Sequence, residues 1–540
     1  MAMTCLNNRK NDSFILSTID ELVPSDHKVR ELEEAIDWTF IYPLVRPLYS
    51  SFGRPSIDPV VLFKMLFINF TFGIHSMRRT CEEIKVNLAY RWFLGLSIDD
   101  EVPNYSTWSQ NYIRRYGDSE IFDEIFNRII EEAIAYDFVD LDTVFGDGTH
   151  RKANANSRKH ENKVVEIVKK HYDDELLEEI NKDREEHGKK ALKETKDIEL
   201  AYDEETGELI EGKGTKSIKV SKTDPESGCF HKGEKQKCFA YTNLTFCDRH
   251  GFVLHNTVAP GNQHDSVVFH DAYRELLNTY GDSIHNISLD AGFITPAICR
   301  EIIEDGIRPY LPYKRPMTKK GFFKKYEYVY DEKLDIYICP NNKDLKYTTT
   351  NKSGYREYKS NPKDCEGCPF LEQCTQSKNH QKVITRHVWE EYRELADEIR
   401  YTPEWKEIYP LRKETIERVY ADCKEKHGLR FTRIRGLKKN QQESLIIFGC
   451  HNLGKLARMK KRRGLINTTS PNKKERHIRK IVQICQFAKK IKRSGRFNKK
   501  FYHFVNSLKL ASVTNFFLLV VFIFFFNSFT FIFNNKHNFF

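Results

Sequence analysis

The stretch LDTVFGDGTH, residues 141–150, combines an apolar run with an acid that is followed by glycine. Apolar runs of this length are typical of buried strands, and glycine marks the position where a strand ends. The stretch NISLDAGF, residues 286–293, repeats this form around a second acid. The two patterns predict two strands that each carry a carboxylate, Asp147 or Asp290, to an open edge of a sheet.

A third acid, Glu417, has a helical setting in the stretch RKETIERVYADCKEKHG, residues 412–428. Apolar side chains recur there at the spacing of one helix face, and Lys424, seven residues after Glu417, shares a face with it. We therefore expect two strand carboxylates and one helix carboxylate to meet around a divalent metal ion.

Three carboxylates suit the chemistry of Mg²⁺. This ion prefers oxygen ligands and keeps several waters, so a few carboxylates and the phosphate oxygens of a substrate complete its coordination. Two such ions about 3.5 to 4 Å apart favour in-line displacement at phosphorus without a protein nucleophile. The alternative is that any one of the 76 acidic residues is a solvated surface charge.

Length and composition limit the class of protein. A chain of 540 residues can bury several cores, so two or three domains are expected. Its 13 cysteines have no regular framework and residues 1–12 are polar, which predicts a reduced, cytoplasmic protein. The net charge of +11 indicates a polyanionic partner.

Positive charge is concentrated near the end of the chain. The segment Lys455–Lys500 holds 18 Lys and Arg but only one acid, a net charge of +17, so the rest of the chain is net acidic. Such density predicts contacts with nucleic-acid phosphates, because neutralising phosphates releases counterions. The alternative is a disordered, solvated tail.

The last segment of the chain is apolar. The run Phe516–Phe533 is about as long as a short membrane span, although Asn527 and Ser528 interrupt it. We interpret it as a C-terminal extension from a changed reading frame or a lost stop codon. A membrane anchor is the alternative, and a membrane partner is not expected.

Four cysteines predict a structural zinc site. Cys365 and Cys368 form a CxxC knuckle, and Cys339 and Cys374 can complete a tetrahedron. Unligated cysteines and a disulfide or redox pair are the alternatives. The stretches at 312–326 and 354–360 are rich in Lys, Arg and aromatic residues, so this segment is also expected to face nucleic acid.

Six stretches, in chain order, carry a resemblance to a known family. They are VFGDGTHRKANANSRK (144–159), HNTVAPGNQHDS (255–266), ISLDAGFITPAI (287–298), PYKRPMTKKGFF (312–323), YKSNPKDCEGCPFLEQCTQS (358–377) and ETIERVYADCKEKHGLRFTRIRGL (414–437). From about Leu16 to about Leu456, the chain resembles the bacterial insertion-sequence DDE transposases. The resemblance implies an RNase H-like core whose Mg²⁺-binding or Mn²⁺-binding triad is Asp147, Asp290 and Glu417.

The family also has a pattern of Tyr, two residues, Arg, three residues, Glu, six residues, Lys. Tyr409, Arg412, Glu417 and Lys424 match it, with one extra residue between the arginine and the glutamate. The resemblance implies catalytic roles for the arginine and the lysine. The extra residue keeps Glu414 as an alternative third carboxylate.

These arguments predict an α/β protein: an RNase H-like core with a helical N-terminal domain and a cysteine-bearing insertion. We expect a helical DNA-binding region at 1–135 and a catalytic core at 136–458 with insertions at 161–230 and 313–385. A basic arm at 459–509 and an apolar, Phe-rich tail at 510–540 follow.

DNA-binding residues are expected in the N-terminal region and the basic arm. Helices are predicted at 57–74, 76–94 and 106–116, the last with Ser106 as its N-cap. They could read transposon ends as a helix-turn-helix-like unit, or could be a plain helical cap on the core. The predicted DNA-binding residues are Arg78, Arg79, Arg114, Arg115, Lys460, Lys461, Arg462 and Arg463.

Within the core, residues 161–211 are predicted to be an exposed helical insertion and residues 239–260 a hairpin. Asp265 is interpreted as a helix cap, although it could rival the triad. The stretch at 441–458 is predicted to be an amphipathic helix that closes the core.

The function predicted from sequence is DNA transposition. The protein is expected to cut at transposon ends by hydrolysis and to join the freed 3′-hydroxyl to target DNA. Its partners would be terminal inverted repeats and target DNA, with a homodimer in the DNA complex, and it would be cytoplasmic and nucleoid-associated. The alternatives are a metal-dependent nuclease or resolvase on the same core, and a catalytically inactive DNA-binding relic.

Overall fold

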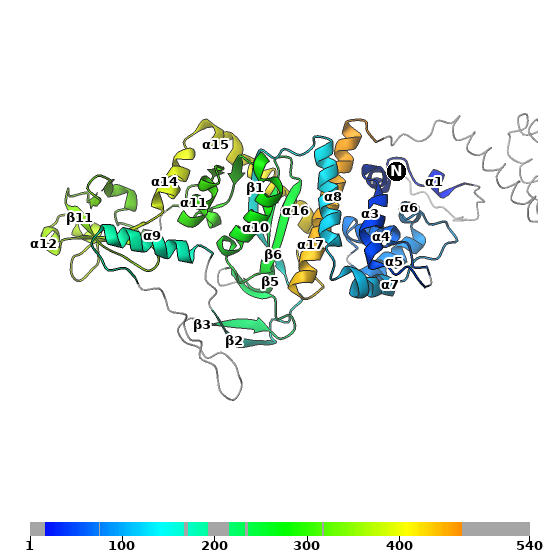
Figure 1. Cartoon of the computed structure of the whole chain (residues 1–540), viewed down its shortest axis with the longest axis horizontal. Helices are drawn as coiled ribbons and strands as arrows, with labels where there is room; N and C mark the ends of the chain where they lie inside the picture. The colour runs from blue at the N-terminus through cyan, green and yellow to red at the C-terminus, as the bar shows by residue number, and fades with distance from the viewer. Residues whose placement is uncertain are drawn as a thin grey trace, which may run out of the picture. The chain divides into compact units, whose positions relative to one another are not determined.

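The computed structural model describes residues 17–53, 55–74, 76–166, 171–192, 215–232, 236–315 and 318–466. Most of the expected basic arm and all of the expected apolar tail lie outside these residues. The described chain is a mixed α/β protein with a helical N-terminal region and two β-sheets (Figure 1). The sequence prediction of an α/β fold with N-terminal helices is confirmed at this level.

The N-terminal helices are shorter than predicted. Asn87 divides the expected helix at 76–94, because its side chain accepts hydrogen bonds from the backbone of Ala89 and Tyr90 and so begins a new helix. Asn104, not Ser106, caps the helix that follows. The helices are α1 (Ile19–Leu22), α2 (Lys28–Ala35), α3 (Ile41–Val45), α4 (Pro59–Thr71), α5 (Met77–Val86), α6 (Leu88–Phe93), α7 (Tyr105–Asn111) and α8 (Ile121–Ala135). Short turns of other helix types lie between them: η1 (Trp38–Phe40), η2 (Arg46–Leu48) and η3 (Tyr112–Tyr116).

Helix α4 is the centre of this region. Asp58 caps it and Pro59 occupies its first turn, where a missing backbone N–H has no cost. Its side chains are apolar on nearly all sides, as expected of a helix that other helices surround. Phe67 packs edge-on against Trp38, and Phe63 packs in the same way against Trp108.

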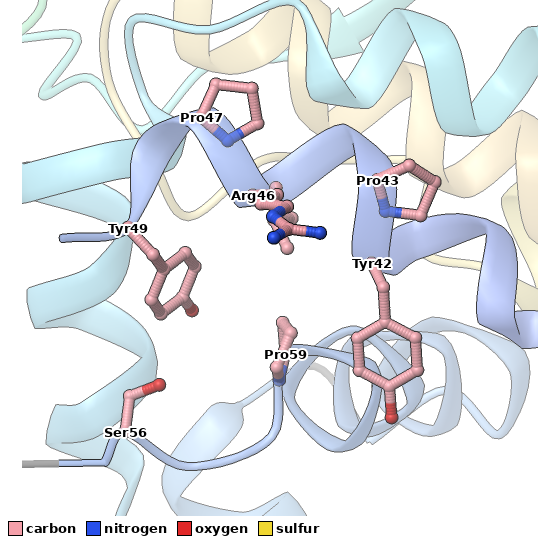
Figure 2. Close-up of a pocket in the computed structure, with 8 residues that line it drawn as sticks. Tyr42, Pro43, Arg46, Pro47, Tyr49, Ser56 and Pro59 are labelled. Atoms are coloured by element: carbon pink, nitrogen blue, oxygen red, sulfur yellow. The ribbon is translucent and has the colours of Figure 1, made fainter. Parts of the chain in front are cut away.

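An open pocket lies beside α4. Figure 2 shows Tyr42 and Tyr49 on opposite sides of it. The Tyr49 hydroxyl is 2.5 Å from the Tyr116 hydroxyl, and the Arg115 guanidinium lies 4.4 Å above the Tyr49 ring centre. Aromatic rings held in this way offer a rigid apolar surface to a partner. The lining residues are Tyr42, Pro43, Val45, Arg46, Pro47, Tyr49, Ser56 and Pro59.

The larger sheet carries two of the three predicted acids. Its strands run in the order β2-β3-β4-β5-β1-β7-β8, and β6 pairs with β5. Strand β1 is antiparallel to β5 and parallel to β7, and β7 is parallel to β8. The strands are β1 (Thr143–Lys152), β2 (His160–Glu166), β3 (Thr215–Ser221), β4 (Gly228–Lys232), β5 (Gln236–Cys247), β6 (Val253–Pro260), β7 (Asn286–Ser288) and β8 (Arg308–Tyr310).

Helices connect the parallel strands. Helix α10 (Asp265–Tyr280) precedes β7, and α11 (Pro296–Glu304) lies between β7 and β8, with short turns η4 (Gly281–Ser283) and η5 (Ala291–Phe293). The predicted β5–β6 hairpin is confirmed. The cap of α10 is His264, whose ring nitrogen accepts from the Ser266 backbone, and not Asp265 as predicted. The side chain of Asp265 lies outside the described part of the chain.

The insertion after β1 is only partly helical, so that prediction needs correction. Residues expected to be helical form β2, which pairs with β3 over seven residue pairs from His160↔Ser221 to Glu166↔Thr215. Val164 and Val165 are β-branched, which favours a strand. Helix α9 (Asp173–Glu186) follows, and β3 then returns the chain to the sheet.

The cysteine-bearing segment forms a second sheet of five strands with its own small core. Tyr337, Leu345 and Tyr358 are buried there and come from three different strands. The elements are η6 (Lys325–Glu327), β9 (Val329–Asp331), β10 (Ile336–Ile338), β11 (Asp344–Thr350), β12 (Tyr355–Ser360), α12 (Pro362–Cys365), α13 (Leu371–Cys374) and β13 (Val383–His387).

The last described helix, α17 (Leu437–Arg462), is longer and more buried than predicted. Residues 444–453 are buried without interruption, so this part of the helix is not amphipathic. It packs against α8, α2 and α4 of the N-terminal region and against β6 of the large sheet (Figure 1). Four elements precede it: α14 (Glu390–Ile399), α15 (Pro403–Ile408), η7 (Tyr409–Lys413) and α16 (Ile416–Lys426). None of the described helices is long and apolar enough to cross a membrane.

Candidate active site

Asp147 lies within β1, where it pairs with Thr245 of β5, and Asp290 follows the end of β7 by two residues. The last pair of the parallel β1–β7 ladder is Phe145↔Ser288, and each acid comes two residues later in its own chain. The register therefore brings Asp147 level with Asp290, just beyond the end of β7. Each acid also accepts a hydrogen bond from a nearby glycine N–H, Asp147 from Gly148 at 2.9 Å and Asp290 from Gly292 at 2.7 Å. The strand-end placement predicted from sequence holds for Asp290 but is wrong for Asp147, because pairing with β5 continues β1 beyond the acid to Lys152.

The backbone before Asp147 is closely packed. A Cβ atom on Gly146 would lie 2.6 Å from Leu289 and 2.7 Å from Phe246, so only glycine fits. This explains the glycine that precedes the acid in the sequence. It also fixes the strand that carries Asp147 against the strand that leads to Asp290.

Arg412 connects the two strands just before the acids. Its Nη1 donates to the carbonyls of Gly146 and Ser288, both at 2.8 Å, and its Nη2 lies 3.7 Å from Asp147 Oδ2. The residue is only 4% exposed. A guanidinium can hold several acceptors in one plane. Arg412 therefore fixes β1 next to the end of β7 and also holds one carboxylate.

Helix α16 brings Glu417 to β1. Tyr420, one turn later on the helix, donates to the Asp147 carbonyl at 2.6 Å. Lys424 donates to the Thr149 hydroxyl at 2.6 Å. Glu417 precedes both on the helix by three and seven residues, so the three side chains share the face that contacts β1.

Tyr409 lies among the charged groups. Burial raises the pKa of its hydroxyl, and the carboxylates of Asp290, Glu417 and Asp147 raise it further, whereas Arg412 lowers it. All three acids are therefore close enough to one ring to act on it electrostatically. The ring itself is stacked on Trp405 at a centroid distance of 4.8 Å.

The extra residue after Arg412 has a structural explanation. Arg412 lies in η7 and Glu417 in the first turn of α16, and the chain turns between them. Thr415 closes this turn by donating to the Leu411 carbonyl at 2.8 Å. The family spacing between Arg412 and Glu417 is therefore not required here, because two short helices, η7 and α16, carry the two side chains. Glu414 is exposed at the end of η7.

The carboxylate oxygens of Asp147, Asp290 and Glu417, the acidic trio, are not all within 4.8 Å of one another. Among the described residues, only His171, His270 and Glu301 bring three potential ligand atoms within 4.8 Å of one another. The acids Asp147, Asp290 and Glu417 are therefore farther apart than the ligands of a single small ion. Their oxygen-only donor set still suits Mg²⁺, which fills its coordination sphere with waters and phosphate oxygens.

Two family models match the chain. The model described as Transposase domain (DUF772) matches residues 17–114, and the model described as Transposase DDE domain matches residues 338–457. Together the two matches support an insertion-sequence DDE transposase. The first match covers α1–α7, and the second covers Glu417 and the four predicted zinc ligands but not Asp147 or Asp290. Among curated proteins, none matches the transposase.

The four cysteines of the transposase lie in neighbouring turns, but no three of their sulfurs lie within 4.8 Å of one another. Asn341, in the turn that begins at Cys339, is 3.6 Å from the Cys368 sulfur, and the Cys368 N–H donates to the Cys365 carbonyl. Burial raises the pKa of the Cys374 thiol, and the nearby Cys365 and Cys339 raise it further, against the lowering effects of Tyr328 and Lys382. All eleven described cysteines are free thiols.

The predicted DNA-binding arginines of the N-terminal region differ in accessibility. Arg78, Arg79 and Arg114 are exposed, and Arg78 also contacts Tyr105, its Nη2 donating to the hydroxyl at 2.6 Å. Arg115 is partly buried over the Tyr49 ring. The first three are placed to meet an external partner.

Of the predicted DNA contacts at the end of α17, Lys460 needs correction, whereas Lys461, Arg462 and Arg463 are exposed. Lys460 is 5% exposed, and its Nζ donates to Glu132 at 2.6 Å and to the Ala35 carbonyl at 2.8 Å. Lys461 pairs with Glu31, and Arg463 donates to the Tyr136 carbonyl. Lys460 is therefore a structural residue that attaches α17 to α2 and α8. Arg462 is exposed at the helix end.

Some residues of the site were not singled out from sequence. Tyr420 reads as a core position of α16, and Thr149 as an ordinary strand residue, but both hold the helix against β1. The His171, His270 and Glu301 cluster comes from three separate segments. No local spacing could have indicated it.

Proposed function

We propose that the transposase cuts DNA at transposon ends and joins the freed ends to target DNA, with Asp147, Asp290 and Glu417 as ligands of Mg²⁺ or Mn²⁺. The observation that carries this proposal is the parallel β1–β7 register, which brings Asp147 level with Asp290, with α16 bonded to β1 beside them. The strand order β6-β5-β1-β7-β8, with three antiparallel strands followed by two parallel ones, supports an RNase H-like core.

Divalent ions, when bound, would stabilise the charge that develops on the attacking and leaving oxygens of an in-line displacement. The protein side chains have simpler tasks. Arg412 holds β1 next to β7 just before Asp147 and Asp290, and the Tyr420 hydroxyl holds α16 against β1. Lys424, two turns after Glu417 on the same face, is positioned to bind a DNA phosphate next to the acids.

We further propose that the N-terminal region reads the transposon end. Arg78, Arg79 and Arg114 provide accessible charge on α5 and η3. A homodimer would bring two such regions to the two ends of the element. The basic segment beyond residue 466 would add phosphate contacts, and its charge comes from the sequence alone.

The proposed activity can be tested with labelled duplexes that carry the terminal repeats flanking the gene. Purified full-length protein with Mg²⁺ should nick the duplex at the repeat boundary and join the new 3′-end to a second DNA. Chelation of the divalent ion should abolish both products and leave DNA binding intact. Cutting without any joining would instead indicate a nuclease.

We also propose that Cys339, Cys365, Cys368 and Cys374 hold one structural Zn²⁺. Four thiolates are a donor set that zinc prefers, and the Lys343 N–H donates to the Cys339 sulfur at 3.3 Å, as in a knuckle turn. The ion would fasten the turn after β10 to α12 and α13.

A Cys368→Ser variant tests this zinc site. It should lose the bound zinc. The second sheet should also become less stable, because the ion would hold the cysteine-bearing turns together. Elemental analysis of the dialysed protein measures the loss. Cys299→Ser serves as the control, since this buried thiol lies on α11 and should leave the zinc content unchanged. Equal zinc content in the wild type and in Cys368→Ser would show that these four cysteines do not hold zinc.

A further inference from the structure

A second cluster of metal-binding side chains lies outside the acidic trio. His171 precedes α9, His270 lies on α10 and Glu301 lies in the last turn of α11. Each residue offers one ligand atom, and these atoms lie within 4.8 Å of one another. Three segments that are distant in sequence thus bring two imidazoles and a carboxylate close together.

The carboxylate is the most informative member. Glu301 is 7% exposed at its side chain, and its Oε1 accepts from His270 Nδ1 at 2.6 Å and from Arg274 Nε at 2.9 Å. Its Oε2 is buried and has no hydrogen-bond partner. A buried carboxylate oxygen without a partner is costly, so a ligand at this position would remove an energetic penalty.

The spacing fits an ion between the groups. His171 Nε2 lies 3.8 Å from the unpartnered Glu301 Oε2, which is too long for a hydrogen bond. Zinc binds nitrogen at about 2.0–2.1 Å and carboxylate oxygen at about 2.0–2.2 Å, so one ion can contact both atoms. His270 would contribute Nδ1, which now donates to Glu301 Oε1 at 2.6 Å, because Nε2 faces away from the carboxylate that shares the ion.

We propose that His171, His270 and Glu301 form a binding site for a zinc-class transition-metal ion, separate from the proposed catalytic site. Imidazole ligands favour Zn²⁺, Co²⁺ or Ni²⁺, whereas Mg²⁺ prefers oxygen ligands. The site is therefore selective for a different metal from the acidic trio. Arg274 limits the net charge of the site, because it pairs with the same carboxylate and with Asp305.

Binding requires one side-chain rearrangement. The rings of His171 and His270 are stacked with their centres 3.6 Å apart and their planes at 13°. Parallel stacked rings cannot both point their nitrogens at one ion, so one ring must turn. The His171 side chain is 30% exposed and contacts the Tyr172 ring edge-on at a centroid distance of 4.9 Å, so it is the ring that can turn toward solvent.

The ion would connect the insertion to the core. It would fasten the segment before α9 to α10 and α11, and α11 begins six residues after Asp290. The existing polar contact in this region, between Arg300 and Glu175 at 2.9 Å, is exposed and weak by comparison. Metal binding would thus restrict the movement of the insertion relative to the helix that follows the second acid.

His171→Ala tests the site without disturbing the fold, because the residue is exposed. Full-length protein dialysed against zinc should contain one zinc equivalent less than the wild type. The matched control is His255→Ala, which removes a similar histidine paired with Glu275 at 3.1 Å. This control should keep the wild-type zinc content.

The difference of one equivalent does not depend on the cysteine site, so the two proposals can fail separately. Cobalt provides a second measurement: the ion lost in His171→Ala should lack the thiolate charge-transfer absorption that a cysteine site gives. A His270→Ala variant should show the same loss as His171→Ala. Unchanged metal content in both histidine variants would show that the cluster is only an ion-pair network around Glu301.

Discussion

Replacing Asp147, Asp290 or Glu417 with alanine is expected to lower DNA end cleavage by about 10³-fold or more, equivalent to about 4 kcal/mol of transition-state stabilisation. Each change removes a proposed ligand of the catalytic ions, and no other protein group is available to perform the displacement. Strand joining should fall with cleavage, because both are displacements at phosphorus. Gel assays of nicked and joined products measure both steps.

The matched control for this series is Glu414→Ala. Glu414 lies three residues before Glu417, at the end of η7 and not on the face of α16 that contacts β1, so its loss should leave both steps within about twofold of the wild type. All variants should bind the duplex as the wild type does, since the acids repel phosphate rather than attract it. A Glu414→Ala variant that is inactive beside an active Glu417→Ala variant would reassign the third ligand.

The sequence predicted the parts of the site that local pattern determines. The strand end predicted at Asp147 is wrong, because β5 pairs with β1 as far as Lys152. An apolar run followed by an acid and a glycine is sufficient to place Asp290 after β7, and helical periodicity places Glu417 on α16. These features depend on neighbours in the chain. The resemblance to a family added Arg412, whose contacts with Gly146 and Ser288 no local pattern could show.

Other predictions failed where tertiary contacts or side-chain caps decide the structure. Asn87 ends one helix and starts another because its amide competes for backbone N–H groups. Residues 161–166 became strand β2 because β3 supplies a pairing partner some 50 residues later. Lys460 reads as part of a basic arm, but Glu132 lies beside it only in the folded chain.

Arg412→Ala is expected to lower the free energy of unfolding by about 2–4 kcal/mol, and to abolish cleavage as well. Two backbone carbonyls, those of Gly146 and Ser288, would lose their shared donor in a buried position, and Asp147 would lose a nearby cation. Denaturant unfolding measures the first effect, and the end-cleavage assay measures the second.

Arg418→Ala is the control, because the side chain of this arginine on the neighbouring helix α16 is 69% exposed and lies 3.6 Å from Asp422. Its unfolding free energy should stay within about 0.5 kcal/mol of the wild type. Arg412→Lys should be intermediate in stability, since an ammonium keeps the charge but lacks the planar fork that reaches both carbonyls and the carboxylate. If Arg412→Ala unfolds like the wild type yet fails to cleave, Arg412 acts on the DNA itself, and the alignment of the two strand ends must come from the packing of Gly146 against Leu289 and Phe246.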